Sequence, residues 1–337
     1  MTQAAARILA ATLTLLSREQ RRLPPPFSLW TEALEPADIM AAARAVADDQ
    51  AEALWVDDAH PARGLLLMRP QPLEAAILGT PSLRLQGPYL VEPDPAERAR
   101  CSSILAAKAV ESAEAQGAAF LSLKTAQDPA VLRGFLEKGF RLAELTARLA
   151  GPLKAAGLPE FPFQRGFGLS LERPELDDSA WLDELGPLFY DGHLLHGPFL
   201  SPSFQPKLWR AVAAREIAAG APALRLTEDR SGRPVGLALV TLRESAAELT
   251  VLHVAEGRRG EGLGRLLLAE IVRAALSLGA KTLQAETAAW NLPALALYLG
   301  LGLKPTAPAA ALHYAFEQRR LNGVWPAPPW RPPRGPS

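Results

Sequence analysis

Several features that would point to other functions are scarce in this sequence. It contains a single cysteine, Cys101, which excludes an internal disulfide and fits a reducing compartment such as the cytoplasm. Lys plus Arg equals Asp plus Glu, at 36 each, so no net charge attracts nucleic acid or an anionic membrane. Zinc-finger spacings are also lacking. We therefore expect a cytoplasmic protein that binds neither nucleic acid nor metal.

Long hydrophobic runs are lacking as well. The apolar stretch at residues 8–16 is too short to span a bilayer, and positive charge follows it, unlike in a secretory signal. Its leucines share one helical face, which predicts a helix on the protein surface, with a membrane-surface helix as the alternative. No stable membrane insertion is expected. At the other end, residues 325–337 are rich in proline, which predicts a tail without packed structure.

A weak internal repeat organises the 337 residues, a length that suits two domains. Residues 128–140 and 291–303 each begin with Asp or Asn, carry an aromatic residue seven positions later and a glycine four positions after that. Just upstream, residues 116–125 match residues 278–287. The offset is 163 residues in the first pair (291 minus 128) and 162 in the second (278 minus 116). The chain therefore contains two copies of one structural unit.

The hydrophobic periodicity predicts an α/β fold, a mixed sheet with helices on both faces. Four regions are expected: an N-terminal helix and linker at 1–27, the first copy at 28–154, the second copy at 155–320 and a proline-rich tail at 321–337. The first copy has predicted helices at 36–49, 97–116 and 129–138, and strands at 64–68, 82–91, 119–124 and 140–150. The second copy has predicted helices at 181–189, 205–218, 263–278 and 292–299, and strands at 167–172, 222–227, 234–242, 248–254, 282–287 and 310–316.

A glycine-rich loop joins the predicted strand ending at Val254 to the predicted helix beginning at Leu263. Glycines let the backbone adopt positive φ and let a ligand approach closely. The first turn of a helix has N–H groups without internal partners, and its dipole favours an anion. No Ser, Thr, Asp or Asn caps this helix, and Arg258, Arg259 and Arg265 add positive charge. The segment is predicted to bind a pyrophosphate; a solvated turn is the alternative.

The corresponding helix of the first copy begins differently. Asp94 stands at the predicted N-cap, Pro95 at the first helical position and Glu97 at the third, the pattern of a capping box. The protein's own carboxylates would then satisfy the free N–H groups. A pyrophosphate would meet Glu92, Asp94 and Glu97 instead of open amides. We therefore expect one phosphate-binding loop per chain, in the second copy.

Two motifs of the second copy resemble those of the GNAT acyltransferases. The residues that carry the loop motif, R/Q-x-x-G-x-G/A, are Arg259, Gly260, Glu261, Gly262, Leu263 and Gly264. Those that resemble the later helix motif are Asn291, Leu297, Tyr298, Gly302 and Leu303, the last in place of the usual Phe. The resemblance implies a tandem GNAT-like fold with a degenerate first copy and a catalytic second copy. It also implies transfer of an acetyl or other acyl group from acetyl-CoA to a primary amine of a small molecule.

The resemblance assigns roles to residues. Tyr298 is implied as the general acid for the departing thiolate, and its counterpart Phe135 has no proton to give. Glu248, six residues before Val254, is implied as the general base, with His253 and Glu286 as alternatives. No Cys or Ser nucleophile stands near the motifs, which favours direct attack by the amine. The residues implied to bind the cofactor are Leu252, His253, Val254, Arg259, Gly260, Glu261, Gly262, Leu263, Gly264, Arg265 and Asn291.

The acceptor is expected to lie against the loop at residues 190–204, which contains His193, His196 and aromatic side chains. This region is weakly similar to dTDP-fucosamine acetyltransferase-like proteins, and mycothiol synthase-like tandem enzymes are other possible relatives. An amino sugar is the first candidate acceptor; an amino acid, a polyamine or a protein amine is the alternative. The two histidines lack a third ligand for a metal. A non-catalytic acyl-CoA-binding or interaction module is the competing function.

Overall fold

The computed structural model describes residue 46 and residues 51–56, 63–90, 92–153, 167–172, 181–185, 204–306 and 308–316. The predicted N-terminal helix, most of the helix at 36–49, most of the acceptor loop at 190–204 and the proline-rich tail lie outside these residues. Within them, no helix is long and apolar enough to cross a membrane.

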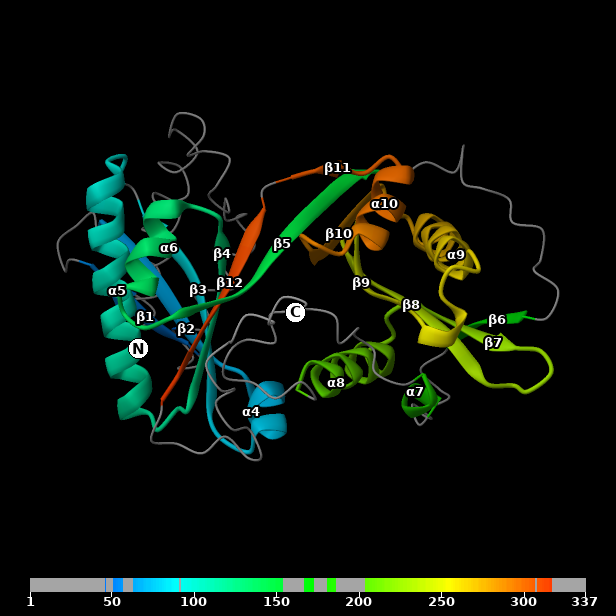
Figure 1. The fold of residues 1–337 in the computed structure, drawn as a ribbon, viewed down its shortest axis with the longest axis horizontal. Helices are drawn as coiled ribbons and strands as arrows, with labels where there is room; N and C mark the ends of the chain where they lie inside the picture. Colours follow the sequence, from blue (N-terminus) through cyan, green and yellow to red (C-terminus); the bar gives the residue numbers. More distant parts are fainter. Residues whose placement is uncertain are drawn as a thin grey trace, which may run out of the picture. The chain divides into compact units, whose positions relative to one another are not determined.

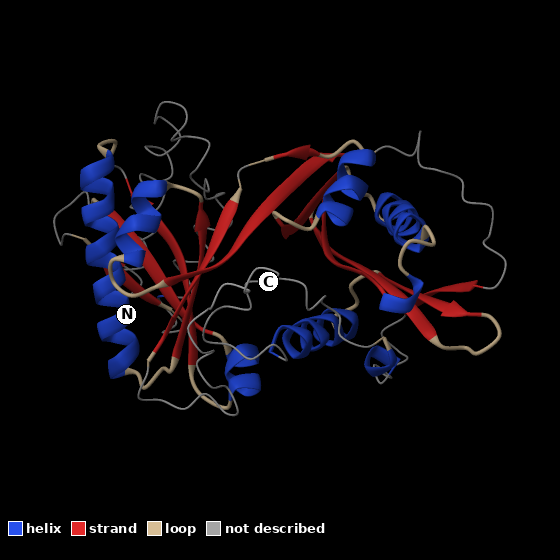
Figure 2. Ribbon diagram, in the orientation of Figure 1, coloured by secondary structure: helices blue, strands red, loops and turns tan. Residues whose placement is uncertain are grey.

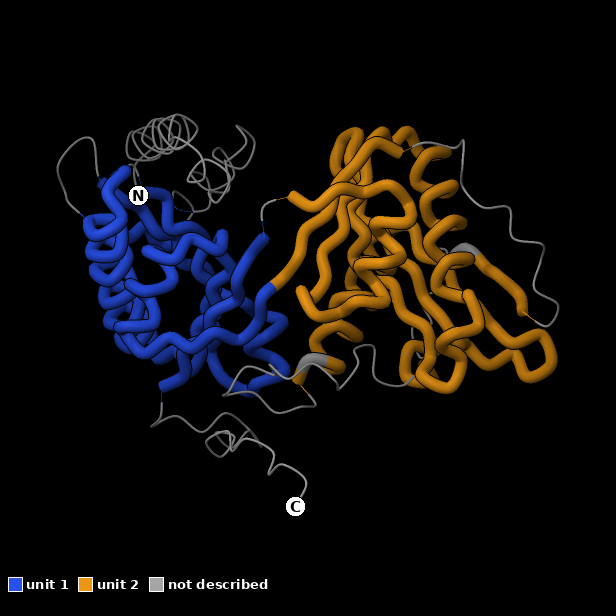
Figure 3. The backbone as a smooth tube through the Cα atoms, turned by 45° about the horizontal axis from the view of Figure 1, so that its top comes forward, with its two compact units in different colours: residues 1–145, 195–201, 307–337 blue, residues 146–194, 202–306 orange. Residues whose placement is uncertain are grey.

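The chain forms two compact units (Figure 3). The N-terminal unit comprises Met1–Leu145, Leu195–Ser201 and Ala307–Ser337, and the C-terminal unit comprises Thr146–Leu194 and Pro202–Thr306. Each unit thus contains chain segments from both halves of the sequence. The predicted boundary between residues 154 and 155 instead assigned residues 28–154 to the first copy and residues 155–320 to the second.

In the N-terminal unit the strands follow the order β1-β2-β3-β4-β12 (Figure 1). Its elements are β1 (Glu52–Trp55), β2 (Gly64–Pro70), α4 (Pro72–Leu78), β3 (Ser82–Leu90), α5 (Pro95–Ala115), β4 (Phe120–Ala126), α6 (Pro129–Leu136) and β12 (Ala309–Ala315). The sequence analysis did not predict β1 or α4. The end signals of α4 are nevertheless visible, because proline stands at its first position and Gly79, with φ 68°, follows its last.

In the C-terminal unit the order is β5-β10-β9-β8-β7-β6, with β11 paired to β5. Its elements are β5 (Arg141–Pro152, shared with the N-terminal unit), β6 (Phe167–Glu172), α7 (Trp181–Glu184), α8 (Phe204–Ala218), β7 (Ala223–Glu228), β8 (Pro234–Arg243), β9 (Ala246–Val254), a short 3-10 turn (Glu256–Arg258), α9 (Leu263–Ser277), β10 (Thr282–Ala288), α10 (Leu292–Gly300) and β11 (Lys304–Pro305). Apart from β11 and the 3-10 turn, all of these elements were predicted to within a few residues, so far as the structure describes them.

The internal repeat is present in three dimensions. Strands β3 and β4 are parallel and pair Ser82 with Phe120, while β9 and β10 are parallel and pair Ala246 with Thr282. The offsets are 164 (246 minus 82) and 162 (282 minus 120), close to the 162 and 163 residues of the sequence repeat, so the two parallel pairs correspond. The sequence repeat and the register together confirm two copies of one unit.

The last strand of each copy pairs with the other copy. We expected the strand after α6 to close the first copy and the strand at 310–316 to close the second. Instead, β5 pairs Thr146 with Ala288 of β10, and β12 pairs Ala309 with Ala126 of β4, both antiparallel. The expectation for β12 was wrong because periodicity predicts that a segment is a strand but does not specify which sheet edge it joins.

Helices cover both faces of the C-terminal sheet (Figure 2). Leucines and other apolar residues of α9 and α10 pack against one face, where Leu249, Leu283 and Ala285 are buried. On the other face, α7 and α8 pack against Leu237, Leu239 and Val251. Because successive strand residues point to opposite faces, these two clusters define an α9 face and an α8 face of this sheet.

Candidate active site

The helix α9 begins without a side-chain cap. Gly262 is its N-cap residue, with φ 82° and ψ −1°, and no side chain accepts a hydrogen bond there. The N–H of Arg265 donates to the Gly262 carbonyl over 3.0 Å. Among the described residues, the N–H groups of Leu263 and Gly264 have no acceptor. These amides and the positive end of the helix dipole form a place for an anion.

Two glycines of the loop, Gly260 and Gly264, differ in their surroundings. Gly260 has φ +86°, which other residues rarely adopt, and a Cβ there would meet no atom within 4 Å. The backbone is therefore open to an approaching ligand at Gly260. A Cβ on Gly264 would lie 3.4 Å from Leu297 Cδ1 and 3.9 Å from Val254 Cγ2. These are ordinary van der Waals distances, so the packing of α9 against β9 and α10 would accept a Cβ at Gly264.

The three arginines of the loop differ in their partners. Arg258 forms an ion pair with Glu228, lies 3.5 Å from Glu261 and stands over the ring of Phe167. Its charge is therefore neutralised by carboxylates, contrary to the expectation that all three arginines serve the phosphate. Arg259 donates from Nε to the Val254 carbonyl over 3.1 Å, which holds the loop against the end of β9. Arg265 is exposed at the third helical position.

The parallel strands β9 and β10 separate on the side of this loop. Their pairing ends where Leu249 faces Ala285, although β9 continues to Val254 and β10 to Ala288. On the other edge of β9, Leu239 pairs with Val251 and Val240 with Leu249, so Thr250 is a β-bulge. Leu252, His253 and Val254 consequently follow an edge of β9 that β10 leaves unpaired. Such an edge can bind an extended chain that carries amide groups.

Tyr298 projects from α10 into the core of the α9 face and is 5 % exposed. Burial raises the pKa of its phenol to about 12, so the hydroxyl stays protonated at neutral pH. Desolvation alone causes this rise of the pKa, with no contribution from a hydrogen bond or a nearby charge. A protonated phenol is suited to act as a general acid.

Asn291 caps α10 and also ties it to β10. Its side-chain oxygen accepts from the N–H of Ala294 over 3.3 Å, and its side-chain nitrogen donates to Thr287 Oγ1 over 2.9 Å. Asn291 therefore fixes the start of the helix that carries Tyr298, beside the section of β10 that has separated from β9.

The candidate bases lie on the α8 face, opposite Tyr298. Glu248 alternates with Ala247 and Leu249 of the α9 face, and its exposed carboxylate lies 3.9 Å from Arg243. His253 is 5 % exposed and alternates with Leu252 and Val254 in the same way. The sheet thus separates the candidate acid from the candidate bases. Reacting groups from the two sides can meet only where β9 and β10 are unpaired.

Sequence reasoning missed two residues of this region. Arg148 on β5 forms an ion pair with Glu286 of β10, Nε to Oε2 2.9 Å. It was overlooked because the strand that carries it was assigned to the first copy. Thr250 was overlooked because a bulge leaves no mark in hydrophobic periodicity. Among the described residues, no three His, Cys, Asp or Glu side chains gather as a metal site would need.

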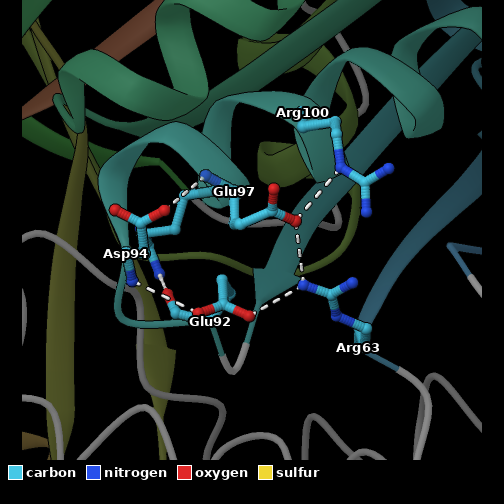
Figure 4. A network of polar contacts seen from close by, with 6 residues as sticks. Arg63, Glu92, Asp94, Glu97 and Arg100 are labelled. Carbon is cyan, nitrogen blue, oxygen red and sulfur yellow. Dashed lines mark hydrogen bonds and ion pairs between the residues drawn. The ribbon is translucent and has the colours of Figure 1, made fainter.

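The helix α5 in the N-terminal unit begins with a side-chain cap and with carboxylates around its first turn (Figure 4). Asp94 accepts from the N–H of Glu97 over 3.2 Å, which confirms Asp94 as the N-cap. The reciprocal bond of the expected capping box comes from Glu92, not Glu97, since Glu92 accepts from the Asp94 N–H over 3.3 Å. Arg63 bridges Glu92 and Glu97 at 2.9 Å and 3.1 Å, and with Arg100 it lowers the pKa of the Glu97 carboxyl.

Packing also closes this site in the N-terminal unit. Helices α5 and α9 end at equivalent positions, but α5 starts at residue 95, so residues 95–100 are helical where the second copy has the loop 257–262. A Cβ on Gly134 would lie 2.5 Å from the Ala99 carbonyl, so α6 packs directly against α5. Phe135, the counterpart of Tyr298, is fully buried with its ring 5.1 Å from that of Phe140. No space for a ligand remains at these contacts.

Comparison with known proteins bears on the family and the fold of the C-terminal unit. Residues 189–303 match the family model described as the acetyltransferase (GNAT) family. This region is a GNAT-family domain. Comparison with curated protein sequences gave no match.

Solved structures of similar fold include tandem GNAT proteins. A tandem GNAT protein from the clavulanic acid biosynthesis pathway has a TM-score of 0.57 at 16% identity, over 92% of this chain and 96% of that one. A GCN5-related N-acetyltransferase from Kribbella flavida has a TM-score of 0.51 at 18% identity, over 95% and 98%. One from Sphaerobacter thermophilus has a TM-score of 0.54 at 17% identity, over 75% and 77%. The chain therefore has a tandem GNAT fold, as the sequence predicted.

Proposed function

We propose that the C-terminal unit transfers an acyl group, in the first place acetyl, from acetyl-CoA to a primary amine of a small molecule. Members of the GNAT family generally transfer acyl groups from acyl-CoA, and the match of residues 189–303 to this family supports the same general chemistry here. The observation that carries the proposal is the uncapped start of α9, with open amides at Leu263 and Gly264 beside the unpaired edge of β9.

Each part of the cofactor has a fitting partner in this region. The pyrophosphate is proposed to bind the amides of residues 260–264, with Arg265 adding positive charge. The pantetheine arm carries two amides, which match the backbone groups of Leu252, His253 and Val254, where β9 continues beyond its pairing with β10. One lone pair of the Val254 carbonyl already accepts from Arg259, and a carbonyl oxygen has two.

The proposed reaction is direct attack by the amine. As the amine nitrogen forms its bond to the acyl carbon, the carbon–sulfur bond breaks and its electron pair goes to sulfur. Tyr298 donates its phenolic proton to that sulfur, which makes coenzyme A leave as the thiol. The amine gives a proton to Glu248 through water. Solvent then returns a proton to Tyr298 and removes one from Glu248, so the enzyme is restored.

An amino sugar is the first acceptor to test, followed by amino acids, polyamines and protein amines. The choice of an amino sugar depends on the sequence resemblance described above. The acceptor would approach on the α8 face, where Glu248 stands, and meet the thioester at the unpaired section of β9 and β10.

Turnover of acetyl-CoA with a panel of amines tests the proposal. Tyr298→Phe should lower kcat by about 10²- to 10⁴-fold and leave the Kd for coenzyme A nearly unchanged, because only the proton donor is lost. The matched control is Tyr314→Phe in the N-terminal unit, which should leave kcat unaltered. Because the pKa of Tyr298 is raised to about 12, kcat should not fall through this group between about pH 7 and pH 10.

Two results would count against the proposal. Full activity in Tyr298→Phe would remove this residue from the mechanism. Binding of coenzyme A without turnover of any amine would instead indicate a non-catalytic acyl-CoA-binding module.

A further inference from the structure

A charged pair stands where β9 and β10 separate. Glu286 is the first residue of β10 beyond its paired section with β9. It alternates with Ala285, which belongs to the core of the α9 face, and with Thr287, which bonds to the cap of α10. Its side chain therefore points to the α8 face. There it meets Arg148 of β5, with the Arg148 Nε 2.9 Å from the Glu286 Oε2.

The first copy carries different residues at the same positions. The equivalent of Glu286 is Lys124 (286 minus 162), and the equivalent of Arg148 is Ala311 (148 plus 163). These two residues face each other across β4 and β12 just as Glu286 and Arg148 do across β10 and β5. Since both copies form the same sheet, the sheet itself does not need the Glu–Arg pair. A functional role in the second copy explains its presence better.

The pair is also placed to exchange partners. Its side chains are 25% exposed for Glu286 and 30% exposed for Arg148, and ion pairs that water reaches contribute little to stability. An incoming ammonium can replace Arg148 as the partner of Glu286. A carboxylate or phosphate on the same molecule can take both donors of the Arg148 guanidinium, a geometry that arginine favours. Both contacts would form on the face from which the acceptor is proposed to approach.

We propose that Glu286 and Arg148 bind the acceptor and make the enzyme specific for amines that also carry an anionic group. The inference rests on the proposed acyl transfer by this unit. Glu286 holds the ammonium beside the opening between β9 and β10, and Arg148 holds a carboxylate or phosphate of the same molecule. Zwitterionic amino acids and phosphorylated amino sugars have this chemistry, whereas simple polyamines and neutral amino sugars do not.

Steady-state kinetics with matched acceptors tests the inference. One pair is an amino acid and its carboxamide, and the other is an amino sugar phosphate and the unphosphorylated sugar. The wild-type enzyme should prefer the anionic member of at least one pair, and the preferred pair tells whether carboxylate or phosphate is recognised. Arg148→Gln should raise KM for that anionic acceptor by about 10- to 100-fold. KM for the neutral member and for acetyl-CoA should stay unchanged.

Further variants separate recognition from structure. Arg148→Lys should recover part of the affinity, because the charge remains but the paired donors do not. Glu286→Gln should raise KM for charged and neutral amines alike. Arg133→Gln removes an exposed arginine of α6 in the N-terminal unit and should leave every KM unchanged.

The results of these experiments distinguish a failure of the proposed acceptor site from a failure of the proposed acyl transfer, on which the acceptor site rests. Equal effects of Arg148→Gln on anionic and neutral acceptors, or no effect on either, would overturn the acceptor site while leaving acyl transfer intact. A wild-type preference for neutral amines would overturn it too. Absence of turnover with every amine would instead remove the proposed function, and the acceptor site with it.

Discussion

Helices α5 and α9 occupy the same place in the two copies, yet their first turns have opposite surroundings. At α5, Asp94 and Glu92 accept the hydrogen bonds of the nearby amides, and Arg63 joins the carboxylates from the outside. At α9, Gly262 stands at the cap and the following amides have no acceptor among the described residues. An anion can therefore bind at α9, where donors are unused, but not at α5, where the protein's own anions are already in place.

The first copy differs from the second in packing as well as in helix capping. Six residues that form a loop at 257–262 are helical at 95–100, which adds about 9 Å of helix at 1.5 Å per residue. Gly134 then lets α6 contact α5 directly, and Phe135 fills the core where the second copy has Tyr298. The comparison shows that one fold can be kept with or without a ligand site, depending on whether its first turn and the adjacent space are filled.

The largest effect should come from the buried ion pair that joins α5 to α6. Arg98 and Asp128 are 1% and 3% exposed, with the Arg98 Nε 3.0 Å from the Asp128 Oδ2. Arg98→Met should reduce the free energy of unfolding by about 3–5 kcal/mol, because it leaves the Asp128 carboxylate buried without its cation. Chemical denaturation of the full chain measures this loss.

The matched control for that experiment is the exposed pair of Arg133 and Glu137 on α6. Arg133→Met should cost at most about 1 kcal/mol, as surface pairs do. Wherever the Arg98 variant stays folded, its Kd for coenzyme A should match the wild type. A loss of coenzyme A binding in that folded state would show that the first copy takes part in cofactor binding.

A smaller effect is expected from a charge reversal at α9. Arg265 and Glu97 both stand at the third position of their helices, so Arg265→Glu gives α9 the acidic first turn that α5 has. The Kd for coenzyme A should rise by about 10- to 100-fold, and less at high salt, because an attraction to the pyrophosphate becomes a repulsion. Arg100→Glu, a charge reversal near the start of α5, should leave this Kd unchanged. Equal Kd values for both variants would show that the pyrophosphate does not bind at the start of α9.

Much of this account could be read from the sequence because it concerns local chemistry. The glycine-rich loop, the caps of α5 and the positions of Tyr298 and Phe135 depend on residues close together in the chain. Proline at the start and glycine at the end of a helix mark its boundaries whether the helix is buried or exposed. Most elements were therefore predicted correctly.

The sequence could not predict contacts between residues that are distant in the chain. Periodicity marked β5 and β12 as strands but did not show that each joins the other copy, so Arg148 was not considered as a site residue. Likewise, Arg258 looked available for phosphate until the fold brought Glu228 from β7 beside it. Contacts between residues distant in the chain, not the local sequence pattern, determine the pairing of β5 and β12 and the partners of Arg148 and Arg258.

Titration of coenzyme A into the full-length chain by calorimetry tests the central claim most directly. With open amides at α9 and a capped, acidic first turn at α5, we expect a stoichiometry of one coenzyme A per chain. Two equivalent sites per chain would contradict the account, as would a single site whose affinity is unaffected by Arg265→Glu.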